Sequence, residues 1–88
     1  MSWNYRACHR PSVPGSGYQI HEIYYDDEGN IEFYTKNPVS PHGDIVDELY
    51  ADLTMMMDAL DFAPIDLDQL DKMFSKKDKD SAWWNFSV

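Results

Sequence analysis

The chain has one cysteine, few basic residues and no long apolar run, and each shortage excludes a class of protein. Because Cys8 has no second cysteine to pair with, no internal disulfide forms and no oxidising compartment is required. No apolar stretch approaches the roughly 20 residues that a membrane-spanning helix needs, and the opening "MSWNYRACHR" lacks the apolar core of a secretory signal. We therefore expect a soluble protein, cytoplasmic in a bacterial host.

Positive charge is also scarce. The chain has 7 lysine and arginine residues against 16 aspartate and glutamate residues, for a formal charge of −9. Such a surface repels nucleic acids, whose binding depends on lysine and arginine displacing counterions, and it repels anionic membranes. The charge argues against nucleic acid and membrane as partners and favours a basic protein. Solubility alone is the competing explanation for so acidic a surface.

Apolar and aromatic residues are plentiful. Of the 88 residues, 43% are hydrophobic and 15% aromatic, which is enough for one folded domain and too much for a disordered chain. We assign residues 1–74 to a single domain and residues 75–88 to a charged linker and an aromatic tail. The tail, with Trp83 and Trp84, either folds back onto the domain or docks on another molecule as a short motif.

Three segments have the composition and alternation of β-strands, namely residues 3–9, 18–25 and 31–35. A short polar turn, in which Gly29 is available for a positive φ, separates the last two and predicts an antiparallel hairpin. Residues 18–25 are apolar on both faces, with Tyr24 on one and Tyr25 on the other. Such a strand is either central in the sheet or keeps one face for a partner, so we expect binding residues here and a candidate homodimer surface.

Residues 45–60 are predicted to form the main helix, with Asp44 placed to cap its first turn. At 100° per residue, its apolar side chains fall within an arc of about 140°, and acidic side chains lie on the opposite side. We expect this helix to lay its apolar arc across the sheet. The residues of the arc are Ile45, Val46, Leu49, Tyr50, Leu53, Met56, Met57 and Leu60.

A second helix is predicted over residues 65–74, where Asp66 and Gln69 have the spacing of a capping box. Strands followed by helices indicate an α+β domain. The fold that we expect is a three-stranded antiparallel sheet, packed on one face by the main amphipathic helix, plus a short C-terminal helix.

Patterns for catalysis or metal binding are missing from the sequence. It contains no nucleophile elbow, phosphate-binding glycine loop or H-E-x-x-H, and the acidic turn before Ile31 lacks the ligand spacing of a calcium loop. His9 and His21 lie on different predicted strands and meet only if these strands pair, with no convincing further ligands. Cys8, in "RACHR", is either an activated thiol or a packed small residue. We expect no enzyme, no cofactor and no metal.

Acidic residues gather on the predicted helices. From Asp44 to Asp71 the sequence has nine acidic residues and no lysine or arginine. We call Asp47, Glu48, Asp52 and Asp58 the acidic ridge and expect it to dock a basic partner. The candidate partner-binding residues are these four, Tyr24 and Tyr25 of the sheet, and Trp83 and Trp84 of the tail.

Several segments resemble known proteins. In order along the chain, "MSWNYR", "YQIHEIYYDDEGNIEFYT" and "NPVSPHGDIVDELYADLTMMMDAL" resemble a group of short uncharacterised bacterial proteins with an MSWNYR start, an IHE-x-YYD strand and an NP-x-x-P-x-GD helix entry; the likeness spans residues 1–70. More loosely, "GDIVDELYADLTMMMDAL" is similar to HicB-type antitoxins, where Gly-Asp opens a helix after a strand pair. That resemblance implies a β-β-β-α core that binds and blocks a small RNA-cleaving toxin, although the antitoxins' separate DNA-binding segment is missing here.

Taken together, the sequence favours a small non-enzymatic protein-binding module, antitoxin-like or regulatory. The alternative is a phage-type inhibitor, an anti-CRISPR or DNA mimic, that blocks a nucleic-acid-binding protein through its acidic helical face. A neighbouring gene for a small basic toxin would indicate the first function, and a prophage location beside anti-defence genes would indicate the second.

Overall fold

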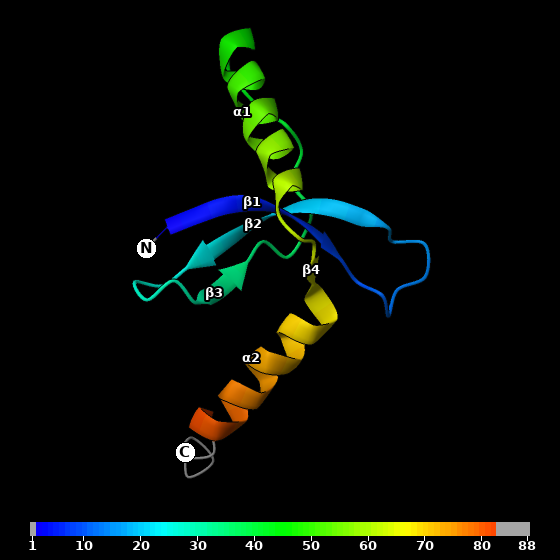
Figure 1. Ribbon diagram of the computed structural model, residues 1–88, viewed down its shortest axis with the longest axis vertical. Helices are drawn as coiled ribbons and strands as arrows, with labels where there is room; N and C mark the ends of the chain where they lie inside the picture. The colour runs from blue at the N-terminus through cyan, green and yellow to red at the C-terminus, as the bar shows by residue number, and fades with distance from the viewer. Residues whose placement is uncertain (1, 83–88) are drawn as a thin grey trace.

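The computed structural model describes residues 2–82, with side chains as far as residue 75, and shows an α+β chain whose two helices leave a small sheet on opposite sides (Figure 1). The predicted α+β class is therefore confirmed. The strands are β1 (Ser2–His9), β2 (Tyr18–Tyr25), β3 (Ile31–Tyr34) and β4 (Ile65–Asp66). The helices are α1 (Val46–Asp58), which continues into the 3-10 turn η1 (Ala59–Asp61), and α2 (Leu67–Ala82).

The sheet has the strand order β3-β2-β1-β4. β1 and β2 pair antiparallel along their whole length, and β2 pairs antiparallel with β3, so the three predicted strands and their hairpin are confirmed. The prediction of three strands, all antiparallel, is wrong because β4 joins β1 in parallel, with Ile65 beside Cys8. A strand of two residues is too short to show alternation, which is why the sequence pattern did not reveal it.

The turn between β2 and β3 forms as predicted. Gly29 has a φ of 86°, a conformation that residues with a Cβ rarely adopt. The Asp26 carboxylate accepts hydrogen bonds of 2.9 and 3.0 Å from the N–H groups of Glu28 and Asn30. Asp26 thereby closes the turn through its side chain.

α2 covers one face of the sheet, where Cys8 and Ile23 are buried with its Leu67 and Leu70. On the other face, Ala7 of β1 is buried with Met56 of α1 and Ala59 of η1. α2, with 16 residues, is longer than the short helix expected. Residues 45–60 meet the sheet through Met56 and Ala59, but the expectation that their apolar arc would lie across it is wrong, because Tyr50 and most of the arc are exposed. The reason is local, because α2 begins directly after β4, and the pairing of β4 with β1 places the first turns of α2 over the sheet.

The sequence predicted a capping residue for each helix, and one of the two predictions is confirmed. Asp66 caps α2 as predicted, since its Oδ1 accepts a hydrogen bond of 3.0 Å from the N–H of Gln69. Asp44 does not cap α1, where Ile45 occupies the N-cap position without a side-chain hydrogen bond. Instead, the backbone N–H of Asp44 donates a 3.0 Å hydrogen bond to Glu48 Oε1, so the glutamate satisfies this backbone group.

Arg6 holds the segment that returns the chain from η1 to β4. Its Nη2 donates a hydrogen bond of 2.7 Å to the carbonyl oxygen of Ala63. Its guanidinium carbon lies 5.0 Å from the centre of the Phe62 ring, within the range of a cation–π contact. This arginine of β1 therefore brings the chain back to the sheet edge where β4 pairs.

Candidate protein-binding surface on α1

α1 meets the sheet along an edge that holds the buried Met56 and the half-buried Asp52. The Tyr5 hydroxyl donates a hydrogen bond of 2.5 Å to Asp52 Oδ1, and the backbone N–H of His42 donates one of 2.8 Å to Asp52 Oδ2. Gly43 lies so near the start of α1 that a Cβ there would come 2.2 Å from the backbone nitrogen of Leu49, so only glycine fits this approach. These contacts turn the Asp52 side of the helix towards the sheet.

The charge on Asp52 is stabilised by the same contacts. The hydrogen bond from Tyr5, and after it the bond from the backbone of His42, lowers the pKa of the Asp52 carboxyl. Burial, followed by the hydrogen bond to Asp52, raises the pKa of Tyr5, so the hydroxyl keeps its proton and continues to donate. Asp52 is thus engaged with the sheet and Glu48 with the backbone of Asp44, whereas Asp47 and Asp58 have no hydrogen bond or ion pair among the described residues.

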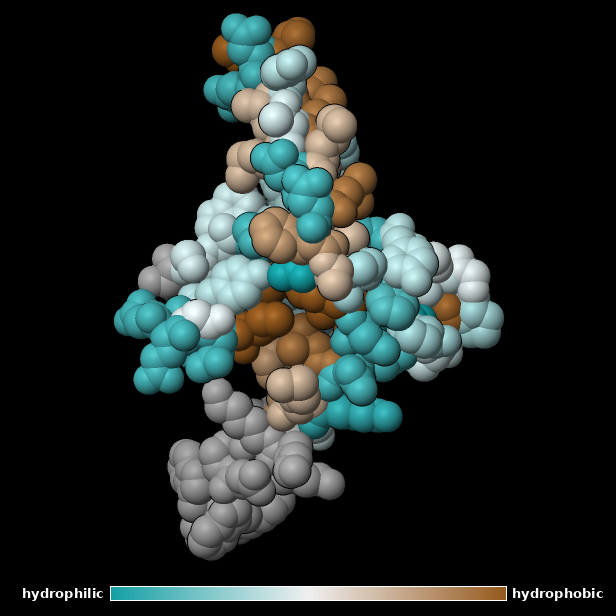
Figure 2. Space-filling view, in the orientation of Figure 1, coloured by the Kyte–Doolittle hydropathy of each residue, from teal (hydrophilic) through white to brown (hydrophobic). Residues whose placement is uncertain are grey.

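Because the edge with Asp52 and Met56 faces the sheet, the remaining apolar side chains of α1 face solvent. Met56 is buried against the sheet, whereas Val46, Tyr50 and Met57 are 79%, 75% and 69% exposed. Figure 2 shows brown side chains along one side of α1. Exposed apolar surface of this kind is typical of an interaction site. We define the α1 apolar face as Val46, Tyr50, Leu53, Met57 and Leu60.

A groove of about 320 Å³ lies beside the α1 apolar face. Its lining is almost wholly apolar, and its volume lies at the low end of the range of about 300–1,000 Å³ seen for ligand pockets. Tyr18 at its rim is 67% exposed and stacks on His9, with 4.9 Å between the ring centres. The groove therefore suits the insertion of apolar side chains. It is lined by Leu53, Met56, Met57 and Leu60 of α1 and η1, and by Ala7, Tyr18, Gln19 and Ile20 of the strands.

Exposed carboxylates accompany this surface. Asp47, Glu48 and Asp58 of the acidic ridge are exposed, as is Asp61 of η1. Within the part of the chain that the structure describes, the side chains of Asp47, Asp58 and Asp61 have no hydrogen bond or ion pair. α1 thus presents uncompensated negative charge next to apolar side chains.

The two candidate tyrosines of β2 lie on opposite faces of the sheet. Tyr24 stacks on Phe33 with 4.5 Å between ring centres, and its hydroxyl donates a 3.0 Å hydrogen bond to Glu22. Tyr25 packs against the core beneath α2 and donates a 2.8 Å hydrogen bond to Asn4 Oδ1. The structure therefore does not bring Tyr24 and Tyr25 together into one surface. The other two aromatic candidates, Trp83 and Trp84, lie outside the described residues.

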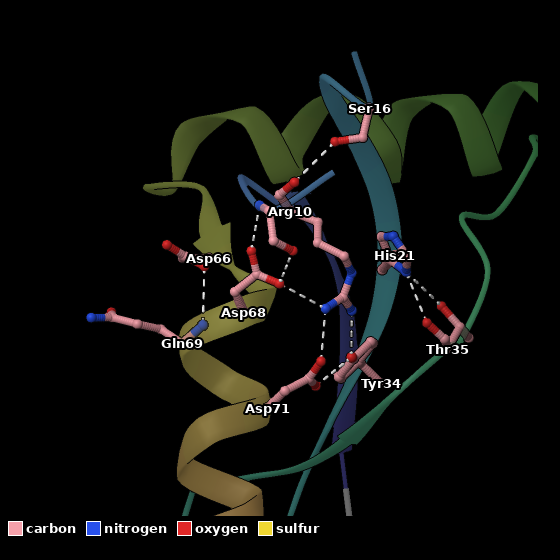
Figure 3. Close-up of polar contacts among 10 residues, drawn as sticks. Arg10, Ser16, His21, Tyr34, Thr35, Asp66, Asp68, Gln69 and Asp71 are labelled. Carbon is pink, nitrogen blue, oxygen red and sulfur yellow. Dashed lines mark hydrogen bonds and ion pairs between the residues drawn. The ribbon is translucent and has the colours of Figure 1, made fainter. Parts of the chain in front are cut away.

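A polar cluster that the sequence pattern did not reveal fastens α2 to the sheet (Figure 3). Arg10 Nη1 donates hydrogen bonds of 3.0 and 2.7 Å to Asp68 and Asp71, and its Nη2 donates one of 2.9 Å to the Tyr34 hydroxyl. Tyr34 in turn donates a 2.6 Å hydrogen bond to Asp71. These partners are separated by 24 to 61 residues in the sequence, so no local pattern could have paired them. The cluster is a structural joint.

The one cysteine is a packed residue. Cys8 is 1% exposed, and burial raises the pKa of its thiol to about 11, so it is protonated at neutral pH and is a poor nucleophile. His21 is also buried, and its Nδ1 donates a 2.8 Å hydrogen bond to the carbonyl oxygen of Thr35. His21 pairs with Arg6 of β1 and so shares its face of the sheet. His9 is three residues further along β1 than Arg6, so it lies on the other face. The two histidines therefore do not meet.

A second hollow, of about 520 Å³, lies against α2 on the opposite side of the sheet. Ile31, Ile65, Leu70, Met73 and Phe74 give it an apolar lining that is continuous with the core. The carboxylate at its rim, Asp66, already caps α2. This hollow is larger than the groove on α1, and Asp66 is the one charged side chain among the described residues that line it.

Comparison with known protein families, with curated proteins and with solved structures gave no match to this chain. Among residues 2–82, no helix combines the length and the apolar character that crossing a membrane requires. Among the side chains that the structure describes, no group of three histidine, cysteine or acidic residues is arranged to hold a metal ion. The α1 surface therefore has to be interpreted from its own chemistry.

Proposed function

We propose that the protein is a small non-enzymatic protein-binding module, antitoxin-like or regulatory, that binds its partner through α1. The observation that carries this proposal is the exposure of the α1 apolar face, with Val46 79% and Tyr50 75% accessible to solvent. A helix of a small domain normally buries such a face, because each apolar side chain moved out of water stabilises the fold. The face on α1 is left for another molecule to cover.

Charge supports a basic partner for this module. The exposed carboxylates Asp47, Asp58 and Asp61 have no compensating groups among the described residues, and the chain carries a formal charge of −9. Complementary charge accelerates encounter and disfavours wrong partners. The resemblance of residues 1–70 to short bacterial proteins, and more loosely to the antitoxin core, also supports this proposal. We place the protein in the bacterial cytoplasm as part of it.

A second candidate is supported by the exposed carboxylates alone. Asp47, Glu48 and Asp58 would let α1 act as a charge mimic of nucleic acid and occupy the binding site of a nucleic-acid-binding protein, as a phage-type inhibitor does. The two candidates differ in what binding requires. The first depends on the apolar face, and the second depends on the carboxylates and should vanish at high salt.

Affinity capture from host lysate at low and high salt, followed by mass spectrometry, tests both candidates. The bait is the full chain, compared with Tyr50→Ser/Met57→Ser on the apolar face and with Asp47→Asn/Glu48→Gln/Asp58→Asn on the carboxylates. Val13→Ala, an exposed apolar residue in the β1–β2 loop, is the matched control. We expect a partner that is retained at both salt concentrations and is lost with the apolar variant.

Two other results would decide against this function. Loss with the carboxylate variant alone, and only at low salt, would establish the charge mimic instead. A set of retained proteins that is identical for all four baits would show that α1 is not the binding surface. Circular dichroism of each variant guards against a trivial loss through unfolding, which exposed substitutions are not expected to cause.

A further inference from the structure

The α1 apolar face has the spacing of one strand of a coiled coil. Val46, Tyr50, Leu53, Met57 and Leu60 follow one another at alternating intervals of four and three residues. This is the spacing of the a and d positions of a heptad, which pack against a second helix. At a rise of about 1.5 Å per residue, the row is about 21 Å long, or about four helical turns. A surface of this shape matches a helix more closely than an extended strand or a small ligand.

The two flanks of this row are chemically different. In the same heptad register, Leu49 and Met56 are the g positions and flank the row on the side of the sheet, where Met56 is buried. On the solvent side, the flanking positions hold Asp47, Thr54 and Asp61. A helix lying along the row would therefore have apolar surface on one flank and carboxylates on the other.

The sheet supplies a second wall for such a helix. Tyr18 and Ile20 of β2 line the groove opposite Met57 and Leu60. An occupant would contact α1 along one side and the end of β2 along the other. This is the arrangement by which grooves take up amphipathic helices through residues spaced three and four apart.

We infer that the occupant of this groove is an amphipathic helix of a different protein, with apolar residues at heptad spacing and lysine or arginine beside them. The inference rests on the proposed function and specifies its partner. Asp47 and Asp61 are the groups that would face the basic residues. A second copy of this chain is a worse occupant, because antiparallel pairing of two α1 helices would set Asp47 of one copy near Asp61 of the other, and neither helix has a basic residue to separate them.

Two synthetic helical peptides test this inference. Both have leucine at their a and d positions; one has lysine at its e and g positions and the other has glutamate, and both are used below the concentration at which they self-associate. We expect the lysine peptide to bind the full chain about tenfold or more tighter than the glutamate peptide in low-salt buffer. Asp47→Asn/Asp61→Asn should remove most of that difference, and Tyr50→Ser/Met57→Ser should abolish binding of both peptides.

Fluorescence anisotropy gives the affinities, and amide chemical shifts locate the bound peptide. We expect shifts at Leu53, Met57 and Leu60 and none at Leu70, while Val13→Ala binds as the unchanged chain does. Equal binding or no binding of the two peptides would overturn the inference, as would shifts confined to the hollow beside α2. A concentration-dependent dimer in sedimentation, abolished by Tyr50→Ser/Met57→Ser, would assign the groove to a second copy. These outcomes differ from a failure of the proposed function, in which the proteins captured from lysate would be the same for every α1 variant.

Discussion

Tyr5 of β1 donates a hydrogen bond to Asp52 of α1, and this contact across 47 residues of sequence lies, like the buried Met56, on the side of the helix that meets the sheet. The carboxylate faces inwards, where the backbone of His42 donates a second hydrogen bond to it. Since the edge with Asp52 and Met56 is turned to the sheet, Tyr50 and Met57 are turned to solvent. The exposed apolar face of α1 is thus linked to where one part-buried polar contact lies.

Tyr5→Phe should loosen α1 and leave the rest of the chain folded. The substitution removes the hydroxyl that donates to Asp52 and keeps the ring that packs on Trp3 at 5.2 Å between ring centres. We expect amide hydrogens of α1 to exchange several-fold faster, because local opening depends on the few contacts that hold an element. Tyr24→Phe is the matched control, since among the described residues the Tyr24 hydroxyl bonds to Glu22 of its own strand and to no other group. Equal exchange in both variants would contradict the anchoring role of Tyr5.

A leucine-to-alanine substitution should cost much stability in α2 and little at Leu60. The periodicity of residues 45–60 alone would instead predict a large cost at Leu60, because it places this leucine in the apolar arc. Leu67 of α2 is 3% exposed and Leu60 of η1 is 67% exposed. Leu67→Ala should lower the free energy of unfolding by about 2–5 kcal/mol, as burial of a leucine requires. Leu60→Ala should change it by no more than about 0.5 kcal/mol. Urea unfolding measures both, and a larger loss for Leu60→Ala would show that the α1 apolar face is buried in solution.

Cys8 should react slowly with thiol reagents in the folded chain. Burial raises the pKa of the thiol to about 11, so few molecules carry the reactive thiolate at pH 8. We expect labelling at pH 8 to be at least tenfold slower than in urea-unfolded chain and to accelerate as the pH rises from about 9 towards 11. Labelling of the native chain at pH 7 as fast as that of the unfolded chain would contradict this prediction and support the interpretation of Cys8 as an activated thiol.

Acid should destabilise the fold through three aspartates. The pKa of Asp52 is lowered by the hydrogen bond from Tyr5, and that of Asp68 by the hydrogen bond from the backbone of Ser12. Burial raises the pKa of Asp71, but hydrogen bonds from Tyr34 and Arg10 outweigh it and the net shift is downwards. A carboxyl group with a lowered pKa in the folded state stabilises the fold above its ordinary pKa of about 3.9 and loses that contribution as the pH falls below it.

The urea midpoint should therefore be nearly constant from pH 7 to about 5 and should fall steeply between about pH 4 and 2. Asp68→Asn/Asp71→Asn should lower stability at pH 7 and make the acid transition shallower. Asp58→Asn is the control, because that exposed carboxylate has no hydrogen bond or ion pair among the described residues, and it should keep the original slope. An unchanged slope in the double variant would exclude the Arg10 cluster as a source of acid sensitivity.

Local patterns in the sequence predicted the elements well, and long-range contacts explain what they missed. Alternating residues marked β2, with Ile23 buried and Tyr18 exposed, and the turn glycine at position 29 and the cap at Asp66 needed only their neighbours. The direction of α1 could not be predicted, because helical periodicity identifies an apolar face without identifying what covers it. The pairing of Arg10 with Asp71 joins residues 61 apart, and no local signal encodes it.

The parallel pairing of β4 with β1 has a practical use. Because the chain returns to the sheet edge between the two helices, α1 and α2 project in opposite directions (Figure 1). A biosensor surface that holds the protein by a tag placed after α2 would display α1 outwards, unobstructed by the support. The same tag placed before β1 would put the support nearer the sheet, so the two orientations offer a direct comparison for any ligand that uses the α1 groove.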